Sequence, residues 1–157
     1  MKKLIFSMLT LSVTATALAD VVNPDSTGFK FTDVKLVKTT PVKDQNRSGT
    51  CWCFAGTSLL EDEILRKSGK EVDLSEMFTV RHCYSDKADR YIRMQGATNF
   101  AAGGSIIDVP YVFEKYGIVP EEAYSGLQYG EEKHDHTELD GVLSSYVKSV
   151  KSTHGKK

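Results

Sequence analysis

The stretch PVKDQNRSGTCWCFA, Pro41 to Ala55, places two cysteines on either side of the chain's only tryptophan, Trp52. This spacing allows three interpretations of Cys51 and Cys53: ligands of a metal, a redox pair, or one nucleophile beside an inert neighbour. Zinc sites usually separate paired cysteines by more than one residue and need further ligands, and redox motifs use the C-x-x-C spacing. The single intervening residue therefore favours the nucleophile.

The residues around Cys51 support that interpretation. The apolar pattern of CWCFAGTSLLEDEILRKSG predicts a helix that begins near Cys51 and ends at Gly69. Unpaired N–H groups and the positive end of the helix dipole would then favour the thiolate, which is the reactive form. Gln45 and the Cys51 N–H are candidate donors to an oxyanion, and Gly49 permits a tight turn with room for a substrate backbone. We expect Cys53 to be a small buried residue, and the same role is the alternative for Cys51.

Three further helices are expected along the chain. One begins at Ser75 as its N-cap, and the next follows Gly103-Gly104 and ends at Gly117, with Pro110 expected to kink it or delay its start. The last segment predicts a helix with one apolar face, which needs a surface to pack against. Its apolar residues are Leu139, Val142, Leu143, Tyr146, Val147 and Val150.

Composition and charge limit the classes of function. The chain has 157 residues, enough for one domain, with 40% hydrophobic and 26% charged residues, and its net charge of -1 gives no reason to expect a nucleic-acid partner. Residues 1–19 combine two lysines, a short apolar run and an Ala-Leu-Ala end, which predicts a signal peptide and export to the periplasm or the outside. A membrane anchor is the alternative, but the run is short and rich in Thr and Ser, so no stable anchor is expected.

The motif around Cys51 resembles the nucleophile segment of papain-like cysteine peptidases. The resemblance continues through Leu74-Ser75-Glu76, Gly103-Gly104-Ser105 and EKYGIVPEEAYSG, residues 114–126, and covers roughly residues 36–126. Within that superfamily the chain is more similar to the bleomycin hydrolase and aminopeptidase C branch. Ser48 stands where many papain relatives have a disulfide cysteine, which implies that Cys83 is a free, buried thiol.

The resemblance implies an α+β fold of the papain type, represented mainly by its helical left domain, with the β-rich right domain largely missing. The expected divisions are a signal peptide at 1–19, the left domain at 20–126 and the start of a helical insertion at 127–157. It implies a peptidase that acts on peptide substrates through a thioester and needs no cofactor or metal. The resemblance is also compatible with a full-length enzyme that forms a homo-oligomer.

The resemblance also assigns roles to residues at matching positions. Cys51 would be the nucleophile and Gln45 the oxyanion donor, Trp52 would pack beside the site, and Gly104 and Gly103 would pair with the substrate backbone. A simple helix-entry turn is the alternative for the two glycines.

The chain departs from the family in one important respect. Thiolate catalysis by this route needs a histidine and an asparagine that orients it, and both usually lie in the second domain, far beyond the cysteine. None of His82, His134, His136 and His154 has the expected context, so none is assigned as the base. We therefore expect the N-terminal part of a peptidase, weakly active or inactive alone. The alternative is a non-catalytic module that retains the peptide-binding part of the cleft.

Overall fold

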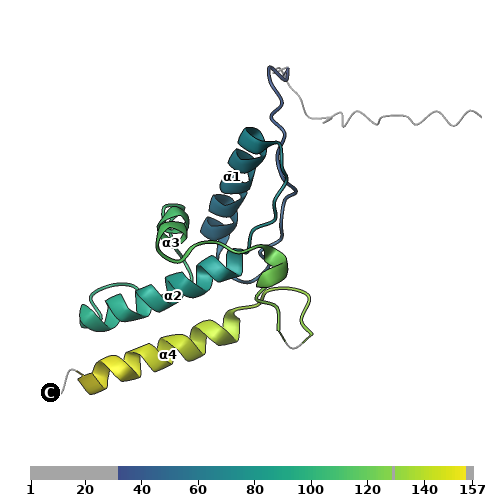
Figure 1. Cartoon of the computed structure of the whole chain (residues 1–157). Coiled ribbons are helices and arrows are strands. Elements are labelled where there is room, and N and C mark those ends of the chain that lie inside the picture. Colours follow the sequence, from purple (N-terminus) through teal and green to yellow (C-terminus); the bar gives the residue numbers. More distant parts are fainter. Residues whose placement is uncertain (1–31, 129, 155–157) are drawn as a thin grey trace, which may run out of the picture. The chain divides into compact units, whose positions relative to one another are not determined.

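Helices account for all the regular structure in the computed structural model, which describes residues 32–128 and 130–154. Within those ranges there is no strand, and only two isolated β-bridges occur, Arg47 with Asp135 and Leu74 with Pro120. From Val37 onward the described residues form one compact unit. In chain order the elements are α1 (Cys51–Ser68), α2 (Glu76–Arg93), α3 (Asp108–Tyr116), the short 3-10 helix η1 (Glu121–Ala123) and α4 (Thr137–His154) (Figure 1).

This arrangement agrees with the predicted helical left domain and confirms the α+β prediction only in part, because the described residues contribute helices alone. The predicted signal peptide, residues 1–19, lies outside the described residues. No helix in the described ranges is both long enough and apolar enough to cross a membrane. The proposed division at residues 126 and 127 stays a prediction.

The structure confirms the predicted start and end of α1 and the predicted start of α2. Gly69 adopts the left-handed conformation, φ 70°, and its N–H donates to the Leu65 carbonyl oxygen over 2.8 Å, which closes the end of α1. Ser75 is the N-cap of α2, and its hydroxyl accepts a hydrogen bond from the Phe78 N–H over 3.0 Å. The end of α1 and the start of α2 therefore lie where capping chemistry satisfies terminal backbone groups.

Proline sets the start of the third helix. α3 begins at Asp108, which puts Pro110 in its first turn, where a missing N–H costs no intrahelical hydrogen bond. Ser105, the expected capping residue, lies before the helix, and its N–H donates to the Asp108 carboxylate over 2.8 Å. The structure therefore agrees with a delayed start.

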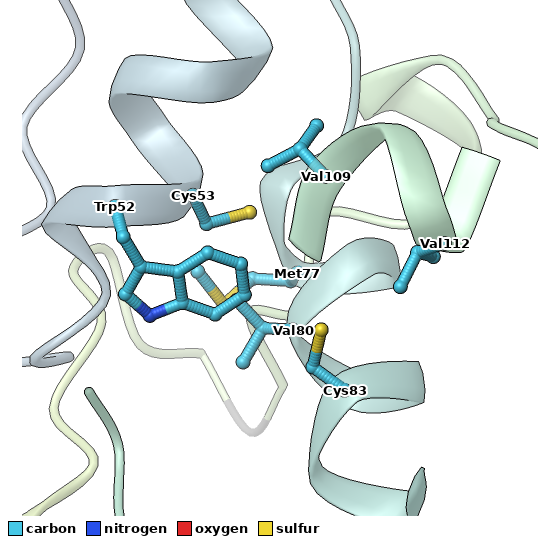
Figure 2. Packing of buried hydrophobic residues seen from close by; sticks show 7 residues of the cluster. All are labelled: Trp52, Cys53, Met77, Val80, Cys83, Val109 and Val112. Atoms are coloured by element: carbon cyan, nitrogen blue, oxygen red, sulfur yellow. The ribbon is translucent and has the colours of Figure 1, made fainter. Parts of the chain in front are cut away.

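The buried core joins the first three helices (Figure 2). α2 contacts α1, α3 and α4, and α1 also contacts α3. The Cys53 and Cys83 thiols lie in this cluster, and burial of its side chains is the main contribution to the stability of the fold. The buried members are Trp52, Cys53, Met77, Val80, Cys83, Val109 and Val112.

The predicted apolar face of α4 is covered only in part. α4 lies beside α2 (Figure 1), and Val147 is buried. Leu143 and Val147 help to line a cavity of about 430 Å³ between the two helices, which is mostly apolar. Val142 and Tyr146 remain exposed. The helix prediction is confirmed, and α2 supplies part of the surface that the apolar face requires.

Candidate active site

Cys51 is the first residue of α1, and its thiol is exposed. The preceding residue, Thr50, makes no side-chain cap, because its hydroxyl lies 2.5 Å from the Ser48 hydroxyl instead. The first turn of α1 also contains no acidic residue. The thiol therefore stands at a helix start whose N–H groups no capping side chain occupies and whose dipole favours negative charge.

A tight turn carries Gln45 up to this helix start. The Ser48 N–H donates to the Gln45 carbonyl oxygen over 3.2 Å. Gly49 has φ 68°, and a Cβ at this position would lie 2.9 Å from the Ala102 Cβ, so the turn needs glycine for both conformation and space. The Gln45 Oε1 atom is enclosed and has no hydrogen-bond partner among the described residues. No hydrogen bond to Oε1 fixes the Gln45 side chain, so its position depends mainly on the backbone of the turn.

Trp52 connects the helix start to the loop before α3. Its indole Nε1–H donates to the Ala102 carbonyl oxygen over 3.0 Å. A Cβ at Gly104 would lie 2.5 Å from Trp52 Cε2, whereas a Cβ at Gly103 would meet nothing within 4 Å. Gly104 is thus packed against Trp52, whereas the space beside Gly103 is open. The Gly103 carbonyl oxygen accepts a hydrogen bond from Lys87 Nζ over 2.6 Å. Contact of either glycine with substrate stays a prediction.

The other two cysteines are core residues. Cys53 and Cys83 are buried, as predicted, and all three cysteines of the chain are free. Burial raises the pKa of the Cys53 thiol to about 12 and that of the Cys83 thiol to about 11. Among the described residues no group of three or more His, Cys, Asp or Glu side chains is arranged to hold a metal ion. Cys51 is therefore the thiol whose surroundings suit nucleophilic chemistry.

The described histidine rings are engaged with aromatic neighbours. His82 stacks on Tyr116 with ring centres 4.1 Å apart, and His134 lies edge-on to Phe54 at 6.4 Å. Burial lowers the pKa of both histidines. No hydrogen bond joins a histidine ring to Cys51 within the ranges that the structure describes. The prediction that none of them is the base is compatible with this arrangement.

Lys43 is the centre of a charge cluster that the sequence analysis missed. Its Nζ lies 3.0 Å from Glu61 Oε1, 2.9 Å from Glu76 Oε1 and 2.6 Å from Asp73 Oδ1. Burial opposes the charge of Lys43, but hydrogen bonds to these carboxylates outweigh it and raise the pKa of the lysine. Because Lys43 lies two residues before Gln45, the cluster ties the start of the turn to α1 and α2. No local pattern identifies these partners, since they lie 18 to 33 residues from Lys43.

A second feature that the sequence did not predict is a contact between the same turn and residues 133–136. Asn46 and Arg47 hydrogen-bond with the backbone of that segment. Asn46 has φ 46°, and asparagine is one of the few residues that adopts this left-handed conformation readily. That preference is the signal in the sequence that could have marked a turn at Asn46.

Comparison with protein families matches residues 28–156 to the family described as papain family cysteine protease. The chain belongs to this family. The matched range includes the turn that carries Gln45, the helix start that carries Cys51, and all of the helices α1 to α4.

Several relatives of the chain are named as cathepsin L or cathepsin L-like proteins. The chain is 39% identical over 85 residues to human cathepsin L2, 37% identical over 87 residues to a cathepsin L-like peptidase of Aedes aegypti, and 33% identical over 103 residues to a cathepsin L-like protein of Caenorhabditis elegans. The aligned parts cover 54%, 54% and 64% of this chain and 23%, 22% and 26% of the relatives. The chain therefore spans about a quarter of their length. These relatives give no support to the aminopeptidase C branch.

Proposed function

We propose that the complete natural protein is a cysteine peptidase that cleaves peptide bonds through a thioester at Cys51. The observation that carries the proposal is the exposed thiol of Cys51 at the uncapped start of α1. The Cys51 thiol gives its proton to a histidine, the thiolate attacks the scissile carbonyl carbon, and the Sγ–C bond forms. The C–N bond then breaks as the imidazolium protonates the leaving amine. Water attacks the thioester carbonyl, the Sγ–C bond breaks, and the carboxylic acid leaves while Cys51 regains its thiol.

The oxyanion of this reaction would be held by the Cys51 N–H and the side-chain amide of Gln45. Two observations support this assignment: Thr50 does not cap the helix, and the hydrogen-bonded turn from Gln45 to Ser48 directly precedes the helix start. Gly49 would leave room for a substrate backbone, Gly104 and Gly103 would pair with that backbone, and Trp52 would pack beside the site. Peptides are the proposed substrates.

The histidine base and the residue that orients it would come from outside the described residues. This view is supported by the packing of the His82 and His134 rings, each of which lies against an aromatic neighbour. We therefore expect the 157-residue chain alone to hydrolyse peptides weakly or not at all. Export of the protein belongs to the same proposal and rests on the pattern of residues 1–19.

The proposal is tested by thiol labelling and peptide hydrolysis in the complete natural protein. Iodoacetamide at mildly acidic pH is expected to label Cys51 and to spare Cys53 and Cys83, because both buried thiols hold their protons. Peptide hydrolysis should be lost in Cys51→Ala and retained in the matched variant Cys53→Ala. Equal labelling of the three cysteines, or full hydrolysis by Cys51→Ala, would contradict the proposal.

The choice between an aminopeptidase and an endopeptidase is part of the same test. The resemblance to the aminopeptidase C branch that the sequence suggested predicts cleavage that depends on a free substrate N-terminus, and the alternative is cleavage that does not. Paired fluorogenic peptides with free and acetylated N-termini separate the two activities. A strong preference for the free N-terminus would support the aminopeptidase prediction.

A further inference from the structure

Residues 133–136, here called the strap, run beside the turn that carries Gln45. The Arg47 N–H donates to the His134 carbonyl oxygen over 3.1 Å, and the His136 N–H donates to the Arg47 carbonyl oxygen over 3.2 Å. These two hydrogen bonds make the parallel β-bridge between Arg47 and Asp135. The strap and the turn are therefore joined through their backbones although they are far apart in the sequence.

Asn46 adds a side-chain bond to this contact. Its Nδ2 donates to the His134 carbonyl oxygen over 3.0 Å, and its backbone N–H donates to the Asp44 carboxylate over 2.8 Å. Lys133 also pairs with Asp44, at 3.3 Å, but both side chains are exposed, so this ion pair adds little stability. The residue immediately after Gln45 is thus fixed from two sides.

The strap is anchored at its other end by α4. The His136 carbonyl oxygen accepts from the Asp140 N–H over 2.8 Å, and the Asp135 carboxylate accepts from the Thr137 N–H over 2.9 Å. The Tyr84 hydroxyl on α2 donates to the Asp140 carboxylate. A continuous series of bonds therefore runs from α2 through α4 and the strap to the turn.

We propose that the strap is a positioning element for Gln45. The Gln45 Oε1 atom has no partner among the described residues, so the direction of its amide depends on how firmly the backbone of the turn is held. The strap bonds the two residues that follow Gln45, which supplies that restraint. This inference rests on the proposed function, since it assigns the strap to the oxyanion donor of that reaction.

Variants at Asn46 test the strap in the complete natural protein. Asn46→Ala removes the amide that binds the strap and disfavours the left-handed backbone, and Asn46→Gly removes the amide while allowing that backbone. Deleting an oxyanion donor lowers the rate more than displacing it does. We therefore expect both variants to lower kcat for peptide hydrolysis about tenfold, with KM nearly unchanged. Glu132→Ala is the matched control, because Glu132 is an exposed residue beside the strap and makes no hydrogen bond or ion pair with another described residue, so kcat should be unchanged.

A double-mutant cycle separates positioning from a merely structural role. If Asn46 acts through Gln45, Asn46→Ala should cause no further loss of kcat in a Gln45→Ala background. An unchanged kcat in both Asn46 variants, or losses that simply multiply in the double variant, would overturn the positioning role while leaving the losses in Gln45→Ala and Cys51→Ala intact. Retention of activity by Cys51→Ala, or no peptide hydrolysis at all, would overturn the proposed function and the positioning role together.

Discussion

Replacing Lys43 with methionine would leave two buried carboxylates without their cation. The Lys43 Nζ binds Glu61 and Glu76, whose side chains are only 1% and 5% exposed. The third partner, Asp73, is 67% exposed and is well solvated without the lysine. Methionine keeps an unbranched apolar stem, so the substitution removes mainly the charge and its hydrogen bonds.

The size of the effect follows from the burial of these groups. Removing one partner of a buried ion pair costs about 3–5 kcal/mol, and we take the lower end, about 3 kcal/mol, because the lysine head is itself partly exposed. In a protein of this size about 1 kcal/mol lowers Tm by about 2–4 °C. The expected decrease in Tm for Lys43→Met is therefore about 6–12 °C at neutral pH.

The loss of stability should also depend on pH in a defined direction. Burial raises the pKa of Glu76, and Lys43 lowers it again in part. Without the lysine the pKa of Glu76 rises further above its value in the unfolded chain, so the folded variant binds a proton that the unfolded chain releases. The stability of Lys43→Met should therefore fall as pH rises above the unfolded pKa, and its deficit relative to the natural protein should be larger at about pH 8 than at about pH 4.5.

Urea unfolding followed by Trp52 fluorescence measures this difference at both pH values. Arg66→Met is the matched control, because Arg66 pairs with Glu63 at 2.7 Å on the exposed side of α1, and its loss should cost much less stability than the loss of Lys43. A cost below about 1 kcal/mol for Lys43→Met at about pH 8 would refute the argument. So would an equal cost at the two pH values.

Two further predictions concern Glu121 and Gly104. Burial and the nearby Glu76 raise the pKa of Glu121 from 4.5 to about 7, so stability should fall as pH rises through this range. Glu121→Gln should remove that slope and gain about 1 kcal/mol at about pH 8, after allowance for solvent screening, and a slope that persists in urea unfolding would contradict this. Gly104→Ala should cost about 1–3 kcal/mol, because its Cβ would lie 2.5 Å from Trp52 Cε2. Gly103→Ala, which meets nothing within 4 Å, should cost less than about 0.5 kcal/mol, and equal losses of Tm would contradict the packing argument.

Local chemistry explains why the helix boundaries were predictable from the sequence. The cap at Ser75 and the left-handed Gly69 act on backbone groups within four residues, so their effect appears in a short window of sequence. The burial of Cys53 was predictable for the same reason, since a helix that begins at Cys51 turns that side chain toward the apolar face. Pro110 likewise limited where α3 could begin.

Tertiary contacts explain what the sequence did not predict. Lys43 and Glu76 are 33 residues apart, and Asn46 and His134 are 88 residues apart, so no helical or strand period relates them. The charged run before α4 has the composition of a solvated loop, yet its backbone carbonyl at His134 accepts two hydrogen bonds from the turn. Backbone bonds of this kind leave no trace in residue type, because any residue can supply the carbonyl.

The turn of residues 43–49 shows how the two kinds of information combine in the candidate site. Its start is held by the charges around Lys43, its middle by the strap at Asn46, and its end by the close approach of Gly49 to Ala102. Between these points the Gln45 amide lies without a partner at Oε1. The amide N–H would donate to the oxyanion, and such a donor works best when the backbone that carries it is rigid. The motif supplies the chemistry of such a donor, and the long-range contacts supply its rigidity, so a substitution far from Cys51 in sequence can alter the reaction without touching substrate.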